Sequence, residues 1–244
     1  MRSWTPLKCS RRSHVPSRPL KLLSSMATRE VLAQIVARYQ RDTARAVIAE
    51  AAGGVDVANR VQAGEAVDVV ILASNAIDKL IAANKLLPDS RADLVRSGIA
   101  IAVRAGEPRP EIGSEEAVKQ AVAAARTLSY STGPSGVYLE KMFERWGILA
   151  AIRNRIVVPP PGVPVGSLVA TGAAEIGLQQ LSELLNVAGI EVVGPLPPAI
   201  QSITVFSGGV SLGCGDPDAA RALLRFMASP EVSGIKKRYG MEAA

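Results

Sequence analysis

Short apolar runs alternate along the first part of the chain with segments whose apolar residues recur every three or four positions. The runs at 20–23, 47–51 and 67–72 predict buried strands. Between and after them, the segments around 31–39 and 77–82 have the spacing of half-buried helices. Because the connections are short, this order favours an α/β fold in which helices cover both faces of a mainly parallel sheet.

The alternation of strands and helices continues through the rest of the chain. Further strands are predicted at 98–103, 127–131, 156–158, 174–178 and 203–206. We expect Gly208 and Gly209 to end the last of these strands, because glycine weakens extended structure. Ser114 and Asp216 are predicted to begin helices, and Asp56 and Ser74 are predicted N-caps of two earlier helices.

This order of elements predicts two lobes. Residues 19–103 and 206–244 would form lobe 1, and residues 104–205 would form lobe 2. Two extended crossings, near Val103 and Val205, would form a hinge between the lobes.

The positive charge of the chain lies almost entirely at one end. Six basic residues and no acidic residue occur in the first 21 positions, which leaves 22 basic and 22 acidic side chains in the remainder. A neutral body argues against a nucleic-acid-binding surface. We expect residues 1–18 to be a disordered basic tail without a recognisable signal peptide, and the protein to be a monomer.

Histidine and cysteine are too scarce for several kinds of active site. His14 is the only histidine and lies in the tail, while Cys9 and Cys214 are far apart in sequence. The composition therefore excludes a catalytic triad with histidine in the folded body and gives poor support to a metal site. We predict no cofactor, no metal and no catalytic residue.

Small, neutral, hydrogen-bonding residues follow the predicted strands. In open α/β sheets, ligands bind at the carboxyl ends of strands, and a helix N-terminus there can hold an anion without a cationic side chain. Each such turn by itself also fits ordinary capping and turn formation. The candidate ligand-binding residues are Ser24, Ser25, Gly53, Gly54, Ser131, Thr132, Gly133, Ser135, Gly136, Gln179 and Gln180.

Four longer segments can be compared with known families, namely LKLLSSMATREVL, GGVDVANRVQAGEAVDVVILASNAIDKLI, SGIAIAVRAGEP and VPVGSLVATGAAEIGLQQLSELL. They resemble the molybdate-binding type of periplasmic substrate-binding protein. The resemblance implies a two-lobed type II fold, a small anionic ligand held between the lobes, a periplasmic location and delivery to an ABC permease. Gly53 and Gly54 stand where the family has a second hydroxyl, and Gln179 or Gln180 where it has a tyrosine. These departures imply a carboxylate or an oxyanion other than molybdate.

An enzyme on the same scaffold is the alternative. Aconitate isomerase resembles this family too, which implies that the scaffold can support proton transfer on a small tricarboxylate. The candidate turns contain no Asp, Glu, Lys or His, and the nearest ionisable residues in sequence are Arg29, Glu30 and Tyr130. Because proton transfer needs a base that reaches the ligand, a binding protein is the favoured interpretation.

Overall fold

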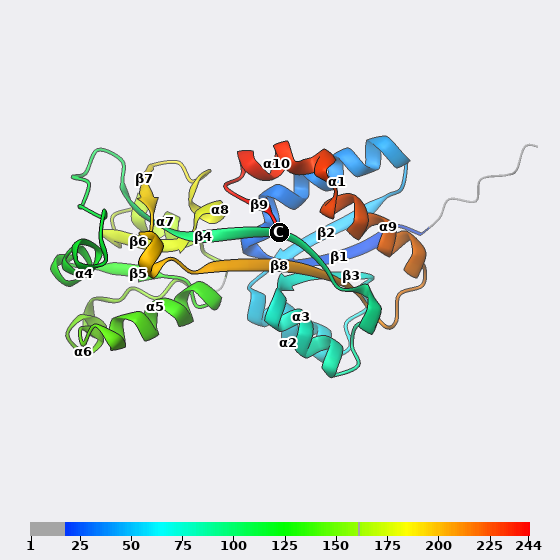
Figure 1. Ribbon diagram of the computed structural model, residues 1–244, viewed down its shortest axis with the longest axis horizontal. Helices are drawn as coiled ribbons and strands as arrows, with labels where there is room; N and C mark the ends of the chain where they lie inside the picture. Colours follow the sequence, from blue (N-terminus) through cyan, green and yellow to red (C-terminus); the bar gives the residue numbers. More distant parts are fainter. Residues whose placement is uncertain (1–17, 161) are drawn as a thin grey trace, which may run out of the picture.

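The computed structural model describes residues 18–160 and 162–244, which form two α/β lobes joined by two long strands, β4 and β8 (Figure 1). Of the predicted basic tail, residues 1–17 lie outside this range, and Arg18 forms an ion pair of 2.6 Å with the buried Asp68. No helix among the described residues is both long and apolar enough to cross a membrane. The predicted two-lobed α/β fold is confirmed.

Lobe 1 has helices on both faces of its sheet (Figure 1). Its strands are β1 (Leu20–Ser25), β2 (Val47–Ala52) and β3 (Val69–Ala73), with the short β9 (Glu242–Ala243) near the C-terminus. Its helices are the 3-10 helix η1 (Met26–Thr28), α1 (Arg29–Thr43), α2 (Gly54–Gln62), α3 (Ser74–Ala82), α9 (Pro217–Ala228) and α10 (Ser233–Arg238).

Lobe 2 has the same layered build with a smaller sheet. Its strands are β5 (Leu128–Tyr130), β6 (Ile176–Gln180) and β7 (Ile190–Pro195). Its helices are α4 (Glu115–Ala124), α5 (Pro134–Arg145), α6 (Leu149–Ile152), α7 (Val165–Ala170) and α8 (Leu181–Leu184). The predicted strand at 156–158 forms only an isolated bridge from Ile156 to Leu128, because the prolines that follow cannot donate to a strand ladder.

The strands β4 (Ala92–Arg104) and β8 (Ile203–Val210) pass from one lobe to the other. The strand order is β2-β1-β3-β8-β4-β6-β5, and β7 and β9 also pair with β4. The pairs β1–β2, β1–β3 and β5–β6 are parallel, as predicted. The crossing strands β4 and β8 are antiparallel to each other, because a chain that leaves a lobe on one strand must return in the opposite direction on the other. The pairs β3–β8 and β4–β6 are antiparallel as well.

The change of strand partners places the crossing close to Gly98. Residues from Ala92 to Gly98 pair with β8, whereas Ile99 to Val103 pair with β6. The Gln201 side chain fixes this point, since its amide accepts from the Ile99 N–H at 2.8 Å and donates to the Ile99 carbonyl at 3.0 Å. The exact lobe boundaries at 103/104 and 205/206 stay a prediction.

The local sequence predictions have mixed outcomes. The helix starts at Ser114 and Asp216 are confirmed, because Ser114 accepts from the Ala117 N–H and Asp216 from the Ala219 N–H, both at 3.1 Å. The caps predicted at Asp56 and Ser74 are wrong, because both residues lie within helices that begin at Gly54 and Ser74. The strand break at Gly208 and Gly209 is wrong, since β8 runs through both. A Cβ on Gly208 would lie 2.3 Å from Leu224, so glycine here allows close packing rather than a turn.

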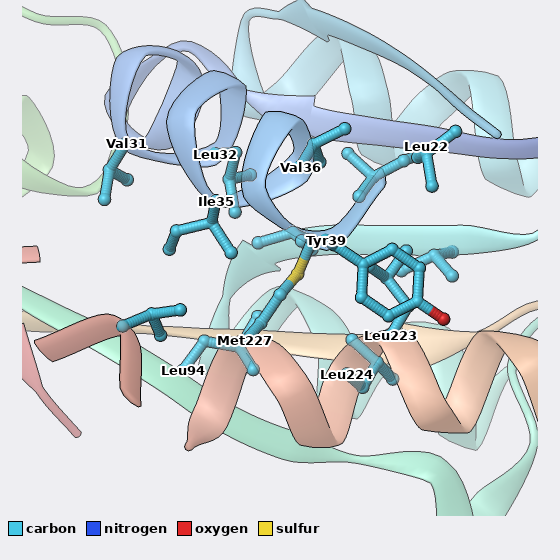
Figure 2. Close-up of a cluster of buried hydrophobic side chains, with 14 of the residues drawn as sticks. Leu22, Val31, Leu32, Ile35, Val36, Tyr39, Leu94, Leu223, Leu224 and Met227 are labelled. Carbon is cyan, nitrogen blue, oxygen red and sulfur yellow. The ribbon is translucent and has the colours of Figure 1, made fainter. Parts of the chain in front are cut away.

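One hydrophobic cluster of lobe 1 lies between α1 and α9, and another lies on the opposite face of the sheet, against α2 and α3. Tyr39 from α1 and Leu223, Leu224 and Met227 from α9 point toward one another beneath the sheet residue Leu22 (Figure 2). All are buried, and full burial of one such side chain contributes roughly 1.5–3 kcal/mol. These contacts hold the C-terminal helices on lobe 1, which explains why the chain returns there through β8.

Candidate functional site

The carboxyl ends of the parallel strands in the two lobes face each other at the crossing. In lobe 1, the last residue of β3, Ala73, pairs with Phe206 of β8. In lobe 2, the last residue of β6, Gln180, pairs with Ile99 of β4. Since Gly98 pairs with Ile203 between these two points, both sets of strand ends lie beside the crossing. The topology therefore brings the sequence-predicted residues of both lobes toward one region.

The two serines of lobe 1 end a strand instead of forming the expected turn. β1 extends through Ser25, and η1 separates it from α1. Ser24 and Ser25 are buried, and the Ser24 hydroxyl lies 3.4 Å from the Glu50 carbonyl, which accepts from it. The Ser25 hydroxyl lies 3.5 Å from that of Thr28, which donates to the Ser25 carbonyl at 3.0 Å. Sequence reasoning missed Thr28.

The glycines at the start of α2 lie next to these serines. Gly53 is the N-cap of α2 and Gly54 is its first residue. A Cβ added to Gly54 would lie 3.8 Å from the Cβ of Ser25. The first N–H groups of a helix have no intrahelical acceptor, so the end of β1 and the start of α2 present hydroxyl and backbone donors side by side.

The turn at residues 131–136 supplies the corresponding donors in lobe 2. The Ser131 hydroxyl accepts from the Gly133 N–H at 2.9 Å, and Gly133 is the N-cap of α5. Gly136 packs directly on the Ser131 carbonyl oxygen. Ser135 is 3% exposed, and no hydrogen bond to its hydroxyl is found among residues 18–160 and 162–244. Thr132 lies exposed at the tip of the turn.

Gln179 and Gln180 lie within β6, and their amides are already used by the protein. The carbonyl oxygen of the Gln179 amide accepts from the Val165 N–H at 3.1 Å. The amide oxygen of Gln180 accepts from the Thr204 hydroxyl at 2.8 Å, and its NH₂ group donates to the Ser97 carbonyl at 2.9 Å. These glutamines therefore tie β6 to α7 and to the crossing strands.

Glu183 of α8 is a carboxylate that sequence reasoning overlooked. It is half-buried, and its Oε1 accepts from the Gln179 NH₂ group at 2.8 Å. Burial raises the pKa of Glu183 to about 7, against smaller lowering effects of the Gln179 hydrogen bond and the Arg29 charge. A carboxyl group with this pKa can both accept and donate a proton near neutral pH.

The neighbour of Glu183 connects the two lobes. The Ser182 hydroxyl donates to the carbonyl of Ala27 at 2.9 Å, and α8 packs against η1. Since η1 follows Ser25 directly, the helix that carries Glu183 lies beside the end of β1 although it belongs to lobe 2. The sequence signal that could have identified Glu183 is its spacing of four residues from Gln179, across the end of a predicted strand.

The ionisable residues considered from the sequence have other partners. Arg29 and Glu30 form an exposed ion pair of 2.8 Å. The Tyr130 ring packs edge-on against Phe143 with centroids 5.7 Å apart, and burial raises the pKa of Tyr130. A surface cavity of about 740 Å³ lies elsewhere in lobe 2, beside Arg104, and contains none of the candidate residues.

Comparison with known proteins supports the two-lobed fold and identifies the family. The family model described as "Bacterial extracellular solute-binding protein" matches residues 20–242. An aconitate isomerase from Pseudomonas sp. is 36% identical over 235 residues, which cover 93% of this chain and 88% of that protein.

Two solved structures share the fold at low sequence identity. The periplasmic molybdate-binding protein of Azotobacter vinelandii has a TM-score of 0.76 at 21% identity, covering 91% of this chain and 98% of that one. A sulfate-binding protein of Mycobacterium tuberculosis has a TM-score of 0.75 at 13% identity, covering 92% of this chain and 86% of that one. With the family match across nearly the whole chain, these findings show that the protein belongs to the bacterial extracellular solute-binding protein family.

Proposed function

We propose that this solute-binding protein holds a small carboxylate anion between its lobes, with Ser25 and the start of α2 on one side and the 131–136 turn on the other. The observation that carries the proposal is the placement of Ser25 and Ser135. Both residues are buried, at 6% and 3% exposure. Ser25 is the last residue of β1, and Ser135 lies in the first turn of α5, which follows β5.

The chemistry of these groups suits an anion. Helices α2 and α5 begin at the candidate residues and have nine and twelve residues. Their first N–H groups and positive dipole ends favour negative charge, and a hydroxyl adds a donor that can rotate toward an oxygen. A buried anion can therefore be satisfied without a lysine, arginine or histidine in either turn.

The ligand class follows from the relative with the higher identity. The Pseudomonas relative is named for its action on aconitate, a tricarboxylate, whereas the molybdate- and sulfate-binding structures are 21% and 13% identical. We therefore assign a carboxylate rather than a metal oxyanion. As in the family, the loaded protein would work outside the cytoplasmic membrane and deliver its ligand to an ABC permease.

Binding of trans-aconitate, measured by isothermal titration calorimetry, tests this proposal. Loss of one hydroxyl should weaken binding by about 1 kcal/mol or more, roughly fivefold, in each of Ser25→Ala and Ser135→Ala. Ser233→Ala, in α10, is the matched control and should bind like the wild type. Unchanged affinity in both site variants would place the ligand elsewhere.

Isomerisation of aconitate is the second candidate function. It is favoured by the 36% identical relative and by the half-buried Glu183 carboxyl beside the proposed site. Proton NMR of trans-aconitate incubated with the protein separates the two functions. Appearance of cis-aconitate shows an isomerase, and line broadening without a new product shows a binding protein.

A further inference from the structure

We propose that Glu183 is the residue that moves the proton in an allylic isomerisation of a small unsaturated tricarboxylate. This inference rests on the proposed anion site and on the second candidate function. It assigns a catalytic role to a side chain that lies outside both candidate turns.

The position of Glu183 carries the argument. Its helix, α8, follows Gln180 at the carboxyl end of β6, where the strand ends of the two lobes face each other. The adjacent Ser182 contacts Ala27 of lobe 1, two residues after Ser25. Arg29, also from lobe 1, acts on the Glu183 charge. A ligand held by Ser25 would therefore lie near this carboxyl group.

The carboxyl group is held in place from one side only. Gln179 donates to Oε1 at 2.8 Å, and the Gln179 amide is itself fixed by the Val165 N–H at 3.1 Å. For Oε2, no hydrogen-bond partner is found within the described part of the chain. One oxygen is thus anchored while the other remains available to a reacting C–H group, which is the geometry that a general base needs.

The charge environment suits a group that both takes and returns a proton. Burial raises the pKa of Glu183 to about 7, and Arg29 lowers it to a smaller extent. Among the elements packed against α8, η1, α7 and β6 have no ionisable side chain. Strands β4 and β7 have ionisable side chains that do not contribute to this shift, namely Asp93, Arg96, Arg104 and Glu191.

The reaction balances with this group alone. A base removes a proton from the methylene carbon of trans-aconitate, and the C–H electron pair forms the new double bond. The original π pair then takes a proton at the other carbon, which becomes the new methylene. Glu183 would accept the first proton and deliver the second, so that no oxidant, reductant or further reactant is required.

The test compares wild type, Glu183→Gln and the control Glu144→Gln, an exposed glutamate of α5. Proton NMR in D₂O follows conversion of trans-aconitate and deuterium uptake, and calorimetry measures its binding. We expect Glu183→Gln to bind within about threefold of wild type, because its amide oxygen still accepts from Gln179, and to lose about 100-fold or more in conversion. The wild-type kcat/KM should rise with pH through about 7.

Each of the other possible results contradicts one part of the proposal. Wild-type conversion rates in Glu183→Gln overturn the role of Glu183 and leave an isomerase. Binding by the wild type with neither conversion nor deuterium uptake also overturns it and leaves a binding protein. Parallel loss of binding and conversion in Glu183→Gln would make Glu183 a ligand-holding residue. If the wild type does not bind trans-aconitate, the proposed function itself fails.

Discussion

Replacement of Gly136 by alanine tests the geometry of the lobe 2 turn most directly. A Cβ at this position would lie 1.5 Å from the carbonyl oxygen of Ser131 and 2.6 Å from its carbonyl carbon. Contacts of a Cβ with other atoms below 3.0 Å are essentially never found, so the turn must open by about 1.5 Å. The obstructing atoms are backbone, and a rotamer change cannot relieve the clash.

The expected loss of folding stability in Gly136→Ala is at the upper end of the range for an overpacked site. Insertion of a methyl group into packed structure costs about 1–3 kcal/mol, and the rigid backbone partner favours about 3 kcal/mol here. For a chain of this length, each kcal/mol lowers Tm by about 2–4 °C, which gives a fall of about 6–12 °C. Opening of the turn should also displace Ser135 and weaken anion binding by at least tenfold, since 1.4 kcal/mol of lost contacts suffices for that factor.

Thermal unfolding followed by circular dichroism, together with calorimetric binding of trans-aconitate, measures both effects. The matched control is Gly113→Ala, because a Cβ at Gly113 meets nothing within 4 Å and the backbone is not left-handed there. It should leave stability unchanged or raise it by up to about 1 kcal/mol. A Tm for Gly136→Ala equal to that of the control would refute the close packing of Gly136 on Ser131.

Two further predictions concern Glu183 and the crossing. The folded-state pKa of Glu183, about 7, lies above its ordinary value of 4.5. The wild type should therefore lose about 3 kcal/mol of unfolding free energy relative to Glu183→Gln as pH rises from 4.5 to above 7. Urea unfolding across this pH range measures the loss, and a free-energy difference between the two proteins that stays constant with pH contradicts the prediction. Gln201→Ala removes the amide that hydrogen-bonds to both backbone groups of Ile99. It should lower the free energy of unfolding by roughly 2 kcal/mol or more, which is measured as a lower urea midpoint. An unchanged midpoint would mean that water replaces the amide without loss of stability.

Local patterns in the sequence were sufficient for most of the fold. The apolar run at 67–72 and the helical spacing around Val31 predicted β3 and α1 because burial periodicity depends on neighbouring residues. The outcome at Gly208 was not predictable in this way. Its role depends on Leu224, which belongs to a different element, and the sequence alone does not show which side chain will approach a glycine.

The candidate site was also predictable only in part, because some of its residues are brought together by distant elements of the chain. Ser25 and Ser135 could be proposed from the sequence because both follow predicted strands. The extension of β1 through Ser25 could not be predicted. Glu183 lies in a four-residue helix after Gln180, a position where a glutamate usually complements a helix dipole. Burial raises its pKa, against a smaller lowering by the charge of Arg29, 154 positions earlier in the chain. Because α8 packs against η1 of lobe 1, a variant that separates the two lobes should expose Glu183 and return its pKa to that of an ordinary surface carboxylate.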